Sequence, residues 1–131
     1  MSSTQNHAER PLSPHLQVWK WTVTMAMSIL HRTTGVANVV GLLAIVWWLL
    51  AAATGPEAYA QFMTFASSLI GKLMFFGWTF SVYLHMLSGL RHLVMDTGHL
   101  LSLKYSTQAV LFIWAFAAIL TAVTWLTILG V

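Results

Sequence analysis

Three long stretches of the chain are almost entirely apolar, at about residues 28–53, 66–94 and 108–130, and polar residues gather between them. A helix that crosses a hydrocarbon core of about 30 Å needs about 20 residues at about 1.5 Å per residue. Each stretch meets this length. The pattern predicts an all-α integral membrane protein with three transmembrane helices, organised as a single membrane-anchor domain over residues 1–131.

The connections between these stretches carry helix-breaking signals. Gly55 is suited to end one helix and Pro56 to begin the next element, which predicts a turn over 54–61 and antiparallel neighbouring spans. Before the first span, residues 1–27 combine polar side chains with tryptophan and lysine. This mixture is typical of a segment that lies at the headgroup boundary, so we expect an interfacial N-terminal segment that is retained and is not a cleaved signal.

Composition supports a membrane protein and narrows the chemistry. Hydrophobic residues make up 58% of the chain and charged residues 7%, against about 25% charged in ordinary soluble domains. Cysteine is absent, which excludes disulfides, thiolate nucleophiles and an iron–sulfur cluster held by this chain's own cysteines. The chain has no room for a soluble catalytic domain, and a metal would have to be bound by histidine.

Charge predicts the orientation of the helices. The formal net charge is +3, but the basic residues are scattered along the membrane edges, which does not favour nucleic-acid binding. By the positive-inside rule the N-terminus and the 95–107 loop face the cytoplasm, in a bacterial cytoplasmic membrane. Five of the six basic residues lie on that side: Arg10, Lys20, Arg32, Arg91 and Lys104.

The second span concentrates polar residues on one face near its end. At about 100° per residue the following positions share a stripe roughly 80° wide: Trp78, Ser81, His85, Gly89, His92 and Asp96. His85 lies about 9 Å deeper than Arg91 along the helix, a spacing that suits a haem whose iron binds below and whose carboxylates emerge near basic residues. Gly89 removes a side chain where a flat ring would approach. An inter-helix hydrogen bond from His85 is the structural alternative.

The first span repeats this concentration of polar groups. Ser28, His31, Arg32 and Gly35 occupy an arc of about 100°. Arginine donates two parallel hydrogen bonds to a carboxylate, and a hydroxyl beside a cation polarises a carbonyl. A haem propionate and a quinone carbonyl are both candidate targets, and a plain cytoplasmic anchor is the alternative for Arg32. Asp96 suits a cap or an ion pair, and His92 and His99 suit positions close to water.

Three motifs in this chain resemble the cytochrome b subunit of succinate dehydrogenase, the larger membrane anchor of respiratory complex II. The resemblance covers most of the chain, and the motifs are long and unusually composed. They are Arg10-Pro-Leu-Ser-Pro-His-Leu16, Ser28-Ile-Leu-His-Arg-Thr-Thr-Gly35, and His85-x3-Gly-Leu-Arg-His-Leu-x-Met-Asp-x-Gly98.

The resemblance implies roles for individual residues. His85 would be one axial ligand of a haem b, with the second histidine supplied by a smaller anchor subunit in a heterodimeric helical bundle. Ser28 and Arg32 would help to form a ubiquinone site near an iron–sulfur subunit. His31, Arg32 and His92 would approach the haem propionates, while the dehydrogenase chemistry would belong to a separate flavoprotein subunit.

These observations favour a redox membrane anchor that passes electrons from succinate oxidation to ubiquinone. A fumarate reductase anchor with the opposite direction of electron flow is the alternative within the same architecture. A haem-free structural anchor and a small transporter module are alternatives of other classes, which an absorption spectrum of the membrane complex would separate.

Overall fold

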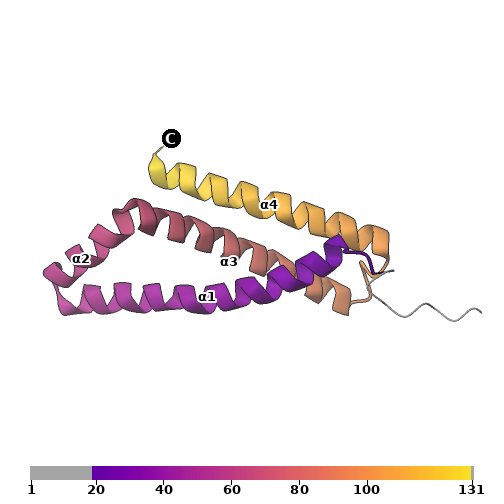
Figure 1. Cartoon of the computed structure of the whole chain (residues 1–131), viewed down its shortest axis with the longest axis horizontal. Coiled ribbons are helices and arrows are strands. Elements are labelled where there is room, and N and C mark those ends of the chain that lie inside the picture. The colour runs from indigo at the N-terminus through magenta and orange to yellow at the C-terminus, as the bar shows by residue number, and fades with distance from the viewer. Residues whose placement is uncertain (1–18, 131) are drawn as a thin grey trace, which may run out of the picture.

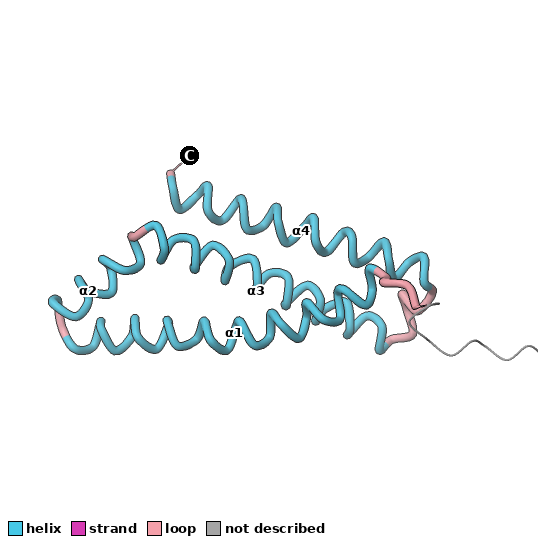
Figure 2. Tube along the Cα trace, in the orientation of Figure 1, coloured by secondary structure: helices cyan, strands magenta, loops and turns pink. Residues whose placement is uncertain are grey.

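The computed structural model describes residues 19–130, and it is helical along almost all of that length (Figure 1). Four helices follow one another: α1 at Val23–Thr54, α2 at Pro56–Ser67, α3 at Leu69–Asp96 and α4 at Leu103–Leu129. Short connections join them (Figure 2). The first resembling motif and most of the predicted interfacial segment 1–27 lie outside the described residues.

Helix boundaries follow local capping chemistry. The side chain of Thr22 accepts a hydrogen bond from the Met25 N–H and so satisfies a free donor at the start of α1. Gly55 has a φ of 140° and separates α1 from α2, and Pro56 occupies the first turn of α2, where its missing N–H costs nothing. The predicted break at Gly55 and Pro56 is confirmed.

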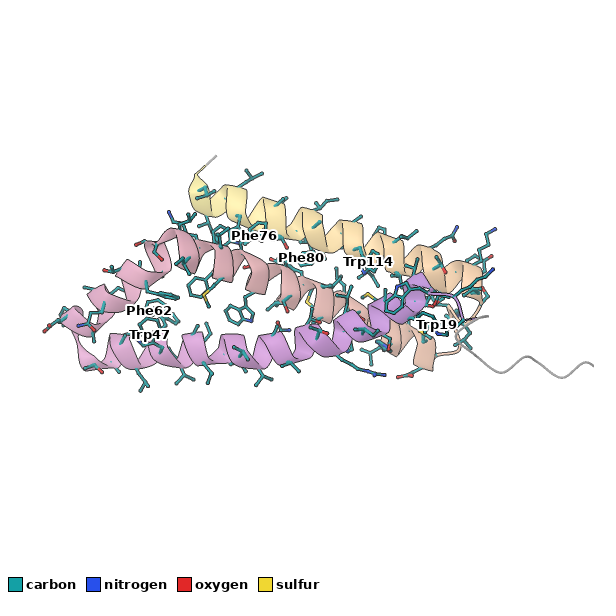
Figure 3. All side chains as sticks on the ribbon, viewed as in Figure 1. Trp19, Trp47, Phe62, Phe76, Phe80 and Trp114 are labelled. Carbon is teal, nitrogen blue, oxygen red and sulfur yellow. The ribbon has the colours of Figure 1, made fainter. Side chains whose placement is uncertain are left out.

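Helix α2 was not expected. The turn predicted over 54–61 is wrong, because only Gly55 interrupts the helices there and the chain continues as α2 to Ser67. The second apolar stretch, expected from residue 66, is instead broken at Ser68, whose extended backbone and side chain cap α3. Phe62 attaches α2 to the bundle: it is buried, and its ring packs edge-on against that of Trp47 on α1 with the ring centroids 5.0 Å apart (Figure 3).

The three long helices form the bundle that carries the site. α1 and α3 run antiparallel, and α4 packs along α3 (Figure 1). The ends of these helices converge where α1 begins, α3 ends and α4 begins, and α1 and α3 are more widely separated where α2 joins them. A small core fills the convergence: Met27, Leu84, Val110, Ile113 and Ala117.

Apolar side chains cover the outside of the bundle. Leu43 and Val36 on α1 and Phe112 on α4 are each about two-thirds exposed, a pattern that suits lipid or neighbouring membrane helices rather than water. Helices α1, α3 and α4 are each long and apolar enough to cross a membrane, by length and composition. The all-α membrane architecture with three spans is therefore confirmed.

Candidate functional site

Three histidines meet at the seam between α1 and α3. The rings of His31 and His85 stack with centroids 4.1 Å apart and planes 9° from parallel. The ring of His92, two helical turns beyond His85, lies 5.0 Å from His31 at a tilt of 40°. The structure therefore brings together residues that are 54 and 61 positions apart in the sequence.

His85 is held on one side by α1. Its Nδ1 lies 3.0 Å from the backbone oxygen of His31 and 3.2 Å from the hydroxyl of Thr34. A carbonyl oxygen can only accept, so the neutral ring carries its proton on Nδ1 in this arrangement. The other nitrogen, Nε2, has a free lone pair and no hydrogen-bond partner in the described part of the chain.

Close packing lets the ring of His85 reach α1. A Cβ at Gly35 would lie 3.2 Å from Cε1 of His85, so a side chain there would press on the imidazole. One turn earlier on α3, the Ser81 hydroxyl donates to Asn38 Oδ1 at 2.9 Å and approaches the Thr34 carbonyl at 3.3 Å. A polar seam thus connects the two helices inside an otherwise apolar bundle.

The three histidines do not form a metal cage of their own. The described residues contain no group of three or more His, Asp or Glu side chains arranged to hold a metal ion. Stacked rings present their faces to one another, and so their nitrogens do not converge. His31 Nδ1 is buried and has no partner among the described residues. Such a buried atom ordinarily has a hydrogen-bond partner, so we expect a group from outside residues 19–130 to reach it.

The two residues predicted to act on a quinone lie on the outside of α1. Ser28 and Arg32 are both exposed, one turn apart, beside the half-buried His31. Neither side chain makes a hydrogen bond within the described residues, which leaves the hydroxyl and the guanidinium available to a group outside this chain. Gly89 faces open space, with nothing within 4 Å of where its Cβ would be.

Arg91 is placed differently from its neighbours in the sequence. It is only 9% exposed, and its Nη2 donates to the hydroxyl of Ser106 on α4. This guanidinium joins α3 to α4 and is turned away from the seam with α1. Asp96 is exposed at the end of α3, and His92 Nδ1 bonds to the Ser88 carbonyl at 2.8 Å.

Sequence reasoning missed Thr34 and Asn38. Thr34 is three residues beyond His31 and Asn38 four beyond Thr34, so helical periodicity puts both on the histidine face of α1. That spacing was the available signal. A Thr or Asn in an apolar helix has many packing roles, however, and only the partner helix shows which one applies.

Comparison with known proteins identifies the family. Residues 6–124 match the succinate dehydrogenase/fumarate reductase transmembrane subunit family. The chain belongs to this family. It is 39% identical over 121 residues to the succinate dehydrogenase cytochrome b556 subunit of Paracoccus denitrificans, which covers 90% of this chain and 93% of that protein. The mitochondrial cytochrome b560 subunit of Sus scrofa is 35% identical over 107 residues, 78% of this chain and 62% of that protein.

Membership of the family agrees with the architecture. The matched region contains the seam histidines, Ser28 and Arg32, and reaches well into the third span. The resemblance drawn from the motifs is confirmed, and the chain is a membrane-spanning subunit of the succinate dehydrogenase type whose relatives are parts of an electron-transporting complex.

Proposed function

We propose that this chain is the large membrane anchor of a succinate dehydrogenase, and that His85 supplies one axial ligand to a haem b shared with a smaller anchor subunit. One observation carries the proposal: α1 fixes Nδ1 of His85, and Nε2 has no hydrogen-bond partner among residues 19–130. A metal-binding histidine characteristically has this arrangement, with its second nitrogen donating to a carbonyl. The names of the relatives, which are cytochrome b subunits, point to the same group.

The residues present fit such a group. A haem needs one imidazole from this chain, and the seam offers one with a free nitrogen rather than a convergent set of ligands. The space beside Gly89 would let a flat ring approach α3. The ring of His31 lies between those of His85 and His92, in contact with each, and Arg32 is the next residue of α1. These polar groups would meet the propionates. When bound, the haem would supply one-electron transfer.

Ser28 and Arg32 form the chain's contribution to a ubiquinone site in this proposal. The Ser28 hydroxyl and the Arg32 guanidinium are exposed on adjacent turns of α1 and make no hydrogen bonds inside the described chain. Both would donate to a quinone carbonyl and stabilise the negative charge that develops on it as it is reduced. The electrons would arrive from an iron–sulfur subunit docked at the cytoplasmic end, and the flavoprotein subunit would oxidise succinate.

The haem proposal is tested by replacing His85 in the assembled complex. We expect His85→Ala to remove the low-spin b-type absorption spectrum, because the iron loses an axial nitrogen. His99→Ala is the matched control, since His99 lies in the exposed loop and bonds only to Thr97 among the described residues. If the spectrum and the haem content of His85→Ala match those of wild type, the ligand assignment is wrong and a haem-free or differently ligated anchor takes its place.

The quinone proposal is tested by comparing two electron acceptors. We expect Ser28→Ala and Arg32→Leu to slow succinate oxidation with ubiquinone by about 100-fold to 1000-fold, the loss typical of a group that stabilises developing charge. Oxidation with a soluble artificial acceptor should be unchanged, because it bypasses the anchor. Thr33→Val, at an exposed neighbour on the same helix, is the control. Equal losses with both acceptors would indicate misassembly instead.

A fumarate reductase anchor is the second candidate, because the matched family includes transmembrane subunits of both enzymes. The same residues would then hold the same groups, while electrons would pass from quinol toward fumarate on the soluble subunits. Measuring succinate oxidation and fumarate reduction rates on one purified preparation separates the two.

A further inference from the structure

Thr34 lies where α1 touches the imidazole of His85. It is buried, at 8% exposure, and its hydroxyl contacts three acceptors or donors at once. The Leu30 carbonyl lies 2.7 Å away, the His31 carbonyl 3.0 Å away and Nδ1 of His85 3.2 Å away. No other described hydroxyl contacts a histidine of the seam.

We propose that Thr34 is a positioning residue for the haem ligand, acting as a second hydrogen-bond acceptor for Nδ1 of His85. The proposal rests on the proposed role of His85 as the axial ligand. Thr34 would not touch the haem or the quinone. It would act through the ring of His85.

The direction of the hydrogen bonds follows from the donors available. The Thr34 hydroxyl has one hydrogen, and its shortest contact is to the Leu30 carbonyl, which can only accept. The hydroxyl hydrogen is therefore used within α1, and a lone pair of the oxygen is directed to His85. The Nδ1–H is then shared between the His31 carbonyl and the Thr34 oxygen.

Two hydrogen-bond acceptors restrict the orientation of the His85 ring more than a single acceptor does. With the carbonyl alone the imidazole can still rotate about its side-chain bonds, whereas two acceptors on α1 restrict the ring plane. They also draw the Nδ1 proton away from the ring, which makes Nε2 a stronger electron donor to iron. A stronger donor favours the oxidised iron, so Thr34 is expected to lower the haem midpoint potential.

The neighbouring contacts hold Thr34 in place. The Ser81 hydroxyl on α3 approaches the Thr34 carbonyl at 3.3 Å and donates to Asn38 at 2.9 Å. Ser81 is one helical turn before His85. Helix α3 therefore contacts Thr34 twice, at its carbonyl through Ser81 and at its hydroxyl through His85. The acceptor is therefore part of a rigid seam rather than a mobile side chain.

The test compares Thr34→Val, Thr34→Ser and Thr33→Val in the purified complete complex. Valine keeps the shape of threonine but removes the acceptor, and serine restores it. Thr33 is exposed and its hydroxyl bonds only to Ile29 of its own helix, so Thr33→Val controls for the loss of a hydroxyl from α1. The readouts are the haem midpoint potential by redox titration and the low-temperature paramagnetic resonance spectrum of the oxidised haem.

We expect the Thr34→Val complex to bind haem. The ratio of reduced to oxidised haem should rise by up to about tenfold, which raises the midpoint potential by about 59 mV for one electron. The resonance signal should broaden or move, and Thr34→Ser should restore both values. If Thr34→Val has the potential and signal of Thr33→Val, or if serine fails to restore them, the positioning role is overturned. The variant His85→Ala, purified in the same way, tests the ligand assignment separately from the positioning role of Thr34. An unchanged haem spectrum in that variant would overturn the ligand assignment itself.

Discussion

Single residues in the seam differ in how much room they leave. Gly35 on α1 lies against the ring of His85, and Gly89 is one helical turn beyond His85 on α3. A Cβ at Gly35 would lie 3.2 Å from the imidazole, whereas one at Gly89 would meet nothing within 4 Å. Gly35 therefore allows the close contact between α1 and the His85 ring. Gly89 leaves a space that the described residues of this chain do not fill.

This contrast gives separable effects on a bound haem. We expect Gly35→Ala to displace the His85 ring by a few tenths of an ångström at a cost of about 0.5–1.5 kcal/mol, and to change the haem spectrum without loss of haem. Gly89→Ala should instead lower the haem content, because the methyl group would occupy the space of the macrocycle. Haem per complex and the absorption spectrum measure both effects.

Gly77→Ala is the control for these variants, because it also adds a methyl group to open space on α3. Full haem content in Gly89→Ala would show that no flat ring lies against that turn.

At the scale of helices, α1 and α3 approach closely at one further point outside the seam. Gly41 on α1 lies against the indole of Trp78, and a Cβ there would overlap Trp78 Nε1. That indole nitrogen is buried and has no partner among the described residues. Beside it a shallow, mostly apolar groove of about 220 Å³ is lined by Ala37, Val40, Gly41, Met74, Gly77, Trp78 and Ser81.

We predict that Gly41→Ala destabilises the anchor by about 1–3 kcal/mol, because the indole has to move to accommodate a methyl group in a packed interface. A methyl group at Gly77 would have no atom within 4 Å, so Gly77→Ala should be neutral or stabilising by about 0.5–1 kcal/mol, because alanine has less conformational freedom to lose on folding. Thermal denaturation of the detergent-solubilised complex measures the difference. Identical transition temperatures for the two variants would contradict the close packing of α1 on α3 at this point.

The whole molecule has its polar and ionisable side chains concentrated at one end and an apolar surface along its length. The convergence of α1, α3 and α4 holds the seam histidines, Arg32 and the buried Arg91, while α2 closes the opposite end (Figure 1). Neither His31 Nδ1 nor Nε2 of His85 has a hydrogen-bond partner within the described residues, so both are available to a group from outside them. We therefore expect the chain to function only as part of a complex.

The orientation of the helix bundle across the membrane can be tested by labelling. Since the chain has no cysteine, single cysteines introduced at exposed Ser102 and Glu57 report opposite ends of the bundle. In intact cells an impermeant thiol reagent should label Glu57→Cys at once and Ser102→Cys only after the membrane is opened, because basic residues favour the cytoplasmic side. The cysteine-free parent is the control. The reverse pattern would place the quinone site on the periplasmic side, out of reach of a cytoplasmic iron–sulfur subunit.

The sequence by itself determined the three spans, the break at Gly55 and Pro56, and the placing of polar residues near one end. These properties depend on local composition and on the fixed thickness of a bilayer, and so they can be predicted without knowing which helices touch. The motif residues likewise identified the family before any fold was known. The proposed roles of His85, Ser28 and Arg32 came from the same motifs and stay predictions.

Only the tertiary structure decided how each helix is rotated about its axis and what each polar group meets. His85 and Arg91 belong to one motif, yet one contacts α1 and the other α4. The Thr34 contact and the helix α2 held by Phe62 also depend on residues far away in the sequence. Hydrophobic periodicity is weak when nearly every face of a helix is apolar, and so helix rotation in this protein is decided by the polar and close-packed contacts between spans.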